Sequence, residues 1–128
     1  MKNKFKENAS KILKNQAQLQ ELLAKARAIG NKYEPLHAVK TDLETSYRLI
    51  QAWSTGDYKT IPWNSLIMLA SGIIYIVNPV DVIPDFILGI GFLDDLAVIR
   101  MIFSAVKKDL DAFRAWEEAL KDTIKVQD

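Results

Sequence analysis

The stretch YIVNPVDVIPDFILGIGFLDDLAVI, residues 75–99, decides the fold, because two apolar segments meet in it across a connection rich in proline, glycine and aspartate. It contains two of the four prolines and two of the five glycines of the chain. Proline and glycine at this density mark turns and helix ends rather than the interior of a helix. We therefore predict a compact, partly helical corner over residues 78–94, with a long helix on either side.

The segment before the corner is almost free of polar residues. Between Lys59 and Asp81 the chain carries no charge, and residues 62–77 predict a helix that is apolar on nearly every face. Such a helix is either the central helix of a bundle or a membrane span, and a span needs about 20 mostly apolar residues. Asn64 and Ser71 dilute this one, and its amphipathic neighbours need an apolar partner. A buried central helix is therefore the preferred interpretation.

Three amphipathic helices are predicted around it, each from apolar residues that recur at steps of three and four. They cover residues 5–29, 35–54 and 94–121. Gly30 and Asn31 supply a stop for the first, and Pro35 fits the first turn of the second. No segment shows the alternation of a strand. The sequence thus predicts an all-α, single-domain bundle of four main helices over residues 1–128.

Composition narrows the chemistry that the chain can perform. It has no cysteine and one histidine, His37. A zinc thiolate site and a cysteine nucleophile are thereby excluded, and any metal site would rely on carboxylate oxygens, which suit Mg²⁺, Ca²⁺ or Mn²⁺. His37 has no second histidine or cysteine with which to share a metal, so we predict a surface or half-buried position and no functional role.

Positive charge is concentrated at the N-terminus. Residues 1–34 carry eight basic and three acidic side chains, whereas residues 35–106 carry four and seven. This is too sparse for the dense basic stripe of a nucleic-acid binder, so no nucleic-acid partner is expected. The solvent-exposed face of a packed helix is the preferred explanation, and a basic helix lying on a membrane surface is the alternative. The same two kinds of explanation apply to the tryptophans Trp53, Trp63 and Trp116. Packing in the core or at its rim is preferred, and a position at a membrane interface is the alternative.

Residues of the corner and of its surroundings form one recognisable pattern. In the corner they are Asn78-Pro79 after a tyrosine, Asp81, Pro84-Asp85-Phe86, Gly91 and Asp94-Asp95-Leu96, and outside it they are Gly56-Asp57-Tyr58, Ile61-Pro62 and the ending Phe113 to Trp116. Over about residues 47–116 this pattern resembles the YkvA-like family, a group of helical domains of unknown function. The resemblance implies a small helical protein with hydrophobic segments, often membrane-associated, and it implies no reaction or cofactor. The basic amphipathic helix of residues 1–34 lies outside it.

Each aspartate of the corner has a structural role available. Asn78 can cap a helix whose third residue is Asp81, and Asp94 can cap the helix that follows, with Asp95 in its first turn. Such a cap stabilises a helix by about 0.5–2 kcal/mol. Asp85 belongs to a turn that contains proline.

The four carboxylates also call for a compensating positive charge, because they repel one another in apolar surroundings. Solvent, an arginine or a bound divalent cation could supply it. Arg100, with Arg48 as the other candidate, is placed to reach Asp81 or Asp85 across the corner. Caps with an arginine pair are the preferred explanation, ahead of a docking surface for a partner or lipid and of an ion site made by Asp81, Asp85, Asp94 and Asp95.

The sequence predicts no catalytic residue, because no nucleophile and general-base set accompanies the aspartates. We therefore expect a non-catalytic helical interaction module that is membrane-associated on the cytoplasmic side, with a membrane surface or a protein as its partner. The candidate docking or ion site consists of Asn78, Asp81, Asp85, Asp94, Asp95 and Arg100. Two alternatives are a divalent-metal-dependent hydrolase-type enzyme that uses the aspartates with Mg²⁺, Mn²⁺ or Ca²⁺, and a soluble cytoplasmic scaffold whose motif is purely structural.

Overall fold

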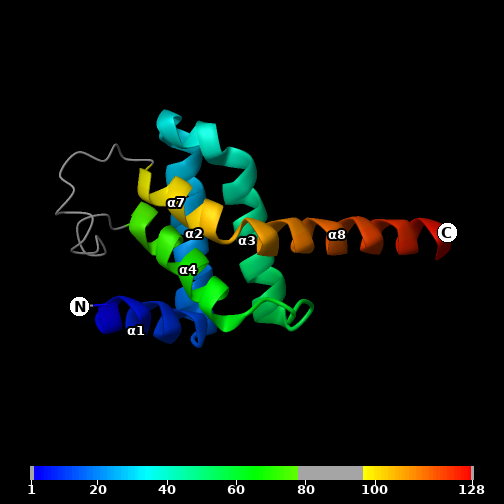
Figure 1. The fold of residues 1–128 in the computed structure, drawn as a ribbon, viewed down its shortest axis with the longest axis horizontal. Helices are drawn as coiled ribbons and strands as arrows, with labels where there is room; N and C mark the ends of the chain where they lie inside the picture. The colour runs from blue at the N-terminus through cyan, green and yellow to red at the C-terminus, as the bar shows by residue number, and fades with distance from the viewer. Residues whose placement is uncertain (1, 78–96, 128) are drawn as a thin grey trace.

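The computed structural model describes the backbone of residues 2–77 and 97–127 and the side chains of residues 7–34, 36–77 and 99–123. Within these ranges the chain is helical and has no strand, which confirms the all-α prediction (Figure 1). In chain order the elements are α1 (Lys2–Leu13), α2 (Gln16–Lys32), the 3₁₀ helix η1 (Glu34–Val39), α3 (Lys40–Thr55), α4 (Trp63–Val77), α7 (Ala97–Ala105) and α8 (Lys107–Gln127). The predicted corner over residues 78–94 lies outside the described residues.

Helix α4 is the centre of the bundle. Nine of its 15 residues are buried, and it packs against α1, α2, α3 and α7. A Cβ added at Gly72 would lie 3.2 Å from the side chain of Ile102, so a glycine at this position lets α7 approach α4 closely. The prediction of a buried central helix is confirmed.

The other interpretation of this helix is a membrane span. Among the helices over residues 2–77 and 97–127, none combines the length and the apolar character that crossing a membrane requires.

The prediction of one helix over residues 5–29 is wrong, because this segment forms α1 and α2. The break falls at Asn15, which has an extended backbone and accepts a hydrogen bond on its side chain from the N–H of Gln18 at 3.0 Å. This is the geometry of a helix N-cap, so a new helix begins there. Gly30 does not end α2, which continues beyond it. A Cβ at Gly30 would lie 3.3 Å from the hydroxyl of buried Tyr47, so this glycine makes room for the tyrosine.

The segment over residues 35–54 is also divided, into η1 and α3. Pro35 lies in the first turn of η1, and α3 begins after that 3₁₀ turn. Gly56 ends α3 with a φ of 89°, a left-handed conformation that a residue with a Cβ adopts only with strain. The glycine therefore sets the direction in which the chain leaves α3 toward α4.

The predicted helix over residues 94–121 is interrupted at Val106, between α7 and α8. The N–H of Val106 still donates to the carbonyl of Ile102 at 3.1 Å, and the chain changes direction there without losing this bond (Figure 1). Asp109 lies in the first turn of α8, where a negative charge meets the positive end of the helix dipole. The four predicted main helices thus correspond to six α-helices and one 3₁₀ helix among the described residues.

Only the first half of α8 packs on the bundle. Leu110 and Phe113 are each 1% exposed, whereas the side chains of residues 118–123 are all exposed. Figure 1 shows this end of α8 extending away from the other helices. The attachment of α8 therefore depends on a short contact surface, made mainly with α3.

Candidate functional site

Most of the predicted site lies outside the described residues. This applies to Asn78, Asp81, Asp85, Asp94 and Asp95, whose capping and ion-binding roles stay predictions. Arg100 lies on α7 with an exposed side chain, and it forms no hydrogen bond or ion pair with a residue that the structure describes. Its pairing with the aspartates of the corner also stays a prediction.

The described residues offer no ligand set for a metal ion. Among their histidine, aspartate and glutamate side chains, no three converge on a common point. His37 is exposed, which agrees with its predicted surface position, and its Nε2 lies 3.4 Å from the carbonyl oxygen of Asn31.

Two arginines join α3 to α8 where the projecting helix leaves the bundle. Arg48 on α3 donates from Nε and Nη2 to the carboxylate of Glu117 on α8, at 2.8 and 3.2 Å. The hydrogen bond with Glu117 raises the pKa of Arg48 further, so the guanidinium stays charged. Arg48 was the other candidate counter-charge for the corner, and the structure instead pairs it with α8.

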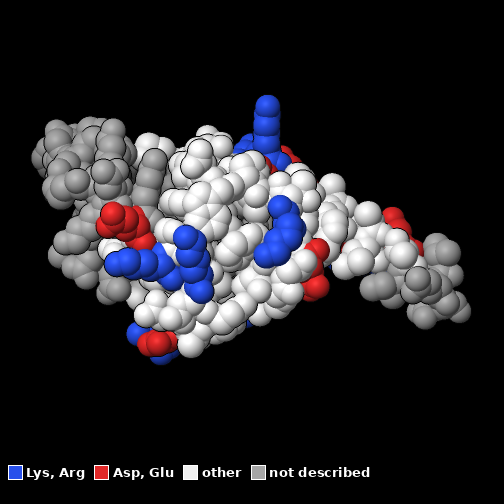
Figure 2. Space-filling model, turned by 90° about the horizontal axis from the view of Figure 1, so that it is seen from below, with Lys and Arg blue, Asp and Glu red and all other residues white. Residues whose placement is uncertain are grey.

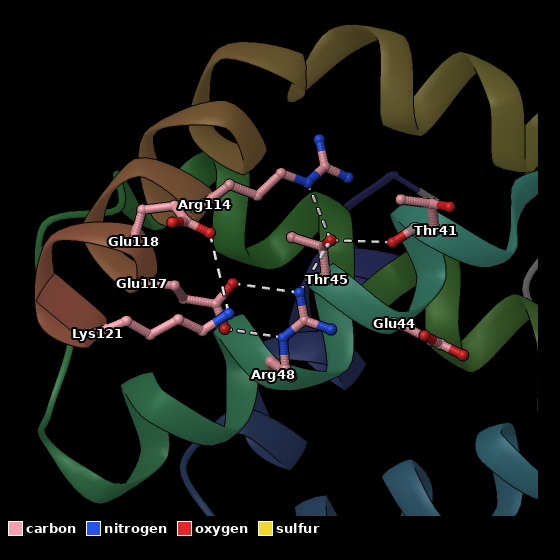
Figure 3. A pocket seen from close by; sticks show the side chains of 8 residues that line it. All are labelled: Thr41, Glu44, Thr45, Arg48, Arg114, Glu117, Glu118 and Lys121. Carbon is pink, nitrogen blue, oxygen red and sulfur yellow. Dashed lines mark hydrogen bonds and ion pairs between the residues drawn. The ribbon is translucent and has the colours of Figure 1, made fainter. Parts of the chain in front are cut away.

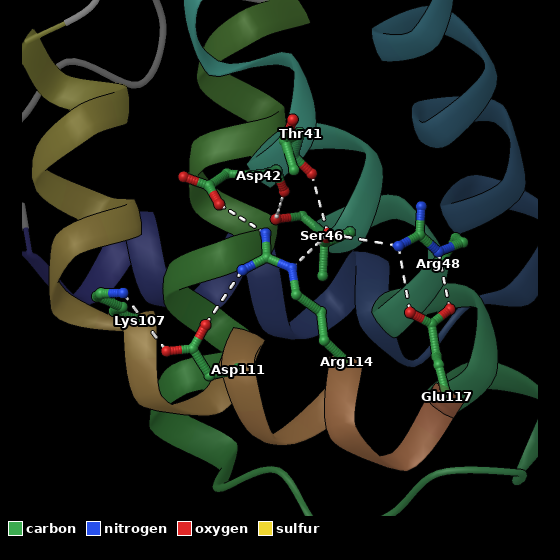
Figure 4. A network of polar contacts seen from close by, with 9 residues as sticks. Thr41, Asp42, Ser46, Arg48, Lys107, Asp111, Arg114 and Glu117 are labelled. Carbon is green, nitrogen blue, oxygen red and sulfur yellow. Dashed lines mark hydrogen bonds and ion pairs between the residues drawn. The ribbon is translucent and has the colours of Figure 1, made fainter. Parts of the chain in front are cut away.

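Arg114 makes the reciprocal connection from α8 to α3. Its Nη2 donates to Asp42 at 2.7 Å, and its Nη1 donates to Asp111, one turn earlier on α8, at 3.2 Å (Figure 4). Lys107 reaches the other oxygen of Asp111 at 3.5 Å. Charges of both signs therefore alternate across the contact between the two helices.

The hydroxyl of Thr45 connects the two arginines. It accepts from Arg114 Nε at 3.1 Å and from Arg48 Nη2 at 3.4 Å, and it donates to the carbonyl of Thr41 at 2.9 Å. Only 1% of Thr45 is exposed, so its hydrogen bonds are completed by protein groups. We call this set the arginine network; its members are Asp42, Thr45, Arg48, Asp111, Arg114 and Glu117.

A cleft of about 280 Å³ opens beside the arginine network, between α3 and α8 (Figure 3). Its lining residues are Thr41, Glu44, Thr45, Arg48, Arg114, Glu117, Glu118 and Lys121. The three basic and three acidic side chains balance, and Figure 3 shows the arginines directed at partners within the cleft wall. This arrangement favours the attachment of α8 over the binding of a charged ligand.

Aromatic packing completes the contact between α8 and the bundle. The ring of Tyr58 lies edge-on to Phe113 at 5.0 Å and 5.1 Å from Trp116, and the last two rings stack at 5.5 Å. Tyr58 is 5% exposed, and burial raises the pKa of its hydroxyl. The left-handed turn at Gly56 precedes it directly. The Gly56-Asp57-Tyr58 and Phe113 to Trp116 parts of the family pattern therefore have a structural role.

A second surface lies where the turn between α1 and α2 meets the connection from α3 to α4. We call it the tryptophan–lysine surface, and it consists of Lys14, Trp53, Lys59 and Trp63. The two indole rings are 6.0 Å apart. The Nζ of Lys14 lies 5.8 Å from the ring centre of Trp63, and that of Lys59 lies 4.7 Å from Trp53. Both distances are typical of cation–π contacts.

This surface faces solvent and has uncompensated positive charge. Trp63 is 40% exposed, and Lys14 and Lys59 are exposed and form no ion pair within the described residues. Figure 2 views the molecule from the side of α1 and shows basic side chains set apart by an uncharged area, with some acidic side chains beside them. The preferred packing role holds for Trp116 and for partly buried Trp53, whereas Trp63 is presented to solvent.

Sequence reasoning missed the arginine network and the contact of Lys14 with Trp63, because these residues are far apart in the chain, although the membrane-interface alternative did name Trp53 and Trp63. Arg48 and Glu117 are 69 positions apart, and no local pattern pairs them. The sequence signals were the spacing of Arg114 after Asp111 on one helix face, the concentration of lysine near the N-terminus, and the tryptophans Trp53 and Trp63.

The fold and these surfaces define a small all-α, single-domain protein with one buried central helix and one basic, tryptophan-bearing side. A family model described as "Protein of unknown function (DUF1232)" matches residues 65–100. The chain is 40% identical over 74 residues to the "Uncharacterized membrane protein YkvA" of Bacillus subtilis (strain 168), which covers 58% of this chain and 70% of that protein. The chain therefore belongs to the YkvA-like family, as its corner pattern predicts. None of the solved structures matches it.

Proposed function

We propose that this protein is a non-catalytic helical interaction module that associates with a membrane on its cytoplasmic side. The basic helix α1 carries the proposal. It contains four lysines and one glutamate, its Ala9 and Leu13 are buried against the bundle, and Lys11 and the following Lys14 are exposed. An anionic leaflet attracts each nearby lysine by about 1 kcal/mol.

Two further considerations support the proposal. The Bacillus subtilis relative is called a membrane protein, and we extend that association to this chain. The anionic surface of cytoplasmic leaflets, which attracts segments rich in lysine, supports the cytoplasmic side. An interaction role, rather than a reaction, agrees with a cleft in which both arginines are held by carboxylates of the protein, Arg48 by Glu117 and Arg114 by Asp42 and Asp111.

Fractionation of cells that express the full chain tests the association. We expect the chain in the membrane pellet at low salt, partly released by high salt, and accessible to protease only in inside-out vesicles. Recovery in the soluble fraction at low salt would favour the soluble scaffold instead, and protease sensitivity in intact cells would contradict the cytoplasmic side.

A charge-matched pair of variants separates α1 from a general effect of net charge. In the first variant Lys4, Lys6 and Lys11 are replaced by glutamine, and in the control the same change is made at Lys107, Lys108 and Lys121 on α8. Both lose three positive charges, but only the first should move the chain from the pellet to the supernatant. An equal loss in both variants would contradict the role of α1.

A further inference from the structure

We infer that the tryptophan–lysine surface forms, beside α1, part of the membrane contact of this protein and that it binds anionic phospholipid, with the indole of Trp63 placed among the headgroups. This inference rests on the proposed membrane association and names its contact surface and its lipid class. The surface combines an exposed aromatic ring with cations that no carboxylate neutralises.

The first argument is the position of Trp63. Its side chain is 40% exposed. Tryptophan combines a large apolar ring with a polar N–H, and this combination is why it is enriched at membrane interfaces. The ring lies at the start of α4 rather than in a loop, and its centre is 6.0 Å from that of partly buried Trp53. The protein therefore presents an indole to solvent from a rigid support.

The second argument is charge. Lys14 and Lys59 come from different connections and flank the two rings, and both are without an ion-pair partner within the described residues. The nearest acid in sequence to Lys59 is Asp57, which forms no ion pair with it; the carboxylate accepts a hydrogen bond from the hydroxyl of Thr55 at 3.1 Å, and this neutral partner does not cancel its charge. Phosphate groups beside an inserted Trp63 would thus meet an ammonium group on either side. An acidic leaflet complements this arrangement, whereas a neutral one does not.

The third argument is that the surface is preformed. The side-chain amide of Gln16 donates to the carbonyl of Ser54 at 2.7 Å, which ties the turn between α1 and α2 to the end of α3. Asn15 caps α2 in the same turn, and Ile61, 8% exposed, anchors the connection to α4 in the core. Binding to a membrane would therefore cost little conformational entropy, because the chain is already ordered at this surface.

Co-sedimentation of the full chain with two kinds of vesicle tests the inference. One contains phosphatidylcholine alone and the other phosphatidylcholine with phosphatidylglycerol. We expect binding to the anionic vesicles only. The changes Lys14→Gln and Lys59→Gln should each weaken it about fivefold, which is about 1 kcal/mol per lysine, and Trp63→Ala should weaken it by about the same factor.

Matched controls lie elsewhere on the molecule. Tyr33→Ala removes an aromatic ring that is also 40% exposed, at the opposite end of α2, and Lys107→Gln and Lys121→Gln remove exposed lysines from α8. These three variants should bind as the wild type does. Circular dichroism melts show whether each variant is folded.

Fluorescence quenching by brominated lipid, measured at a vesicle concentration that binds all of the protein, gives a second readout. Quenching in the wild type should be largely lost in Trp63→Phe and kept in Trp116→Phe, because Trp116 packs on Phe113 away from this surface.

The outcomes distinguish the two proposals. Binding that the surface variants and the controls weaken equally would overturn this inference and leave the membrane association standing. Equal binding to both vesicles would overturn the lipid class. Binding to neither would overturn both proposals. If Trp63→Ala instead converts a dimer into a monomer on a sizing column, the surface is a contact between two copies and the inference is wrong.

Discussion

Replacement of Arg114 by methionine should lower the free energy of unfolding by about 1–2 kcal/mol. The arginine side chain is 32% exposed, and its partners Asp42 and Asp111 are 40% and 53% exposed. Solvent screening at this exposure limits the two ion pairs to about 0.2–1 kcal/mol each. The hydrogen bond from Nε to the hydroxyl of Thr45 adds about 0.5–1.5 kcal/mol.

Two features keep the expected loss from being larger. Thr45 retains Arg48 and the carbonyl of Thr41 as partners, so no buried hydroxyl is left without a hydrogen bond. Methionine also keeps most of the apolar stem that arginine packs against α3.

Urea unfolding followed by circular dichroism measures the effect, and Lys107→Met is the matched control. The ammonium group of Lys107 lies 3.5 Å from Asp111, and its side chain is 74% exposed, so its loss should cost less than about 0.5 kcal/mol. Hydrogen exchange should also rise in α8 of Arg114→Met before it rises elsewhere. Equal destabilisation by the two variants, or unchanged exchange in α8, would refute the view that the arginine network holds α8 to α3.

Three other predictions concern the backbone, the core and the corner. Gly56→Ala should destabilise the protein by about 1 kcal/mol in thermal melts through backbone strain alone, since no atom lies within 4 Å of the added Cβ. Gly56→Asn should recover part of the lost stability, because asparagine tolerates this conformation better than alanine. Equal melting temperatures for Gly56→Ala and the wild type would contradict the strain. Burial raises the pKa of Tyr47 from 10.0 to about 12. Because the unfolded chain releases this proton first, the stability that the protonated Tyr47 contributes is intact below pH 10 and is lost as the pH rises toward 12. In urea unfolding, the free energy of unfolding of Tyr47→Phe should therefore fall less over this pH range than that of the wild type. If the aspartates of the corner are caps and arginine partners, millimolar Mg²⁺, Mn²⁺ or Ca²⁺ should leave the melting temperature unchanged, whereas a rise that Asp81→Asn abolishes would establish an ion site.

Helical periodicity predicted where helices form but not where they are divided. The apolar stripe of residues 5–29 continues across Asn15, since a cap replaces only one turn of the pattern, although the step of six positions from Leu13 to Leu19 was a signal. At Val106 the hydrogen bond to Ile102 persists through the change of direction, so no proline, glycine or cap marks the break. Breaks of this kind depend on which bundle face each half must cover, which is a tertiary property.

The candidate surfaces were less predictable than the helices. Gly56 and Tyr58 could be singled out from the sequence because turn chemistry and the family pattern are local. The partners of Arg48 and the proximity of Lys14 to Trp63 depend on how α1, α3, α4 and α8 cross one another. No spacing rule along one chain contains that information.

The treatment of positive charge distinguishes the two surfaces physically. In the arginine network each guanidinium contacts a carboxylate and a hydroxyl. Its charge is therefore neutralised within the protein, and these contacts hold α8 in place. On the tryptophan–lysine surface the described partners of the ammonium groups are indole rings, which attract a cation without cancelling its charge. The field that remains there can act on an anionic partner, whereas the field of the network cannot. Therefore the arginine network, in which each arginine is paired with a carboxylate, is the structural region, and the surface built from two lysines and an exposed indole is the better candidate for contact with a membrane.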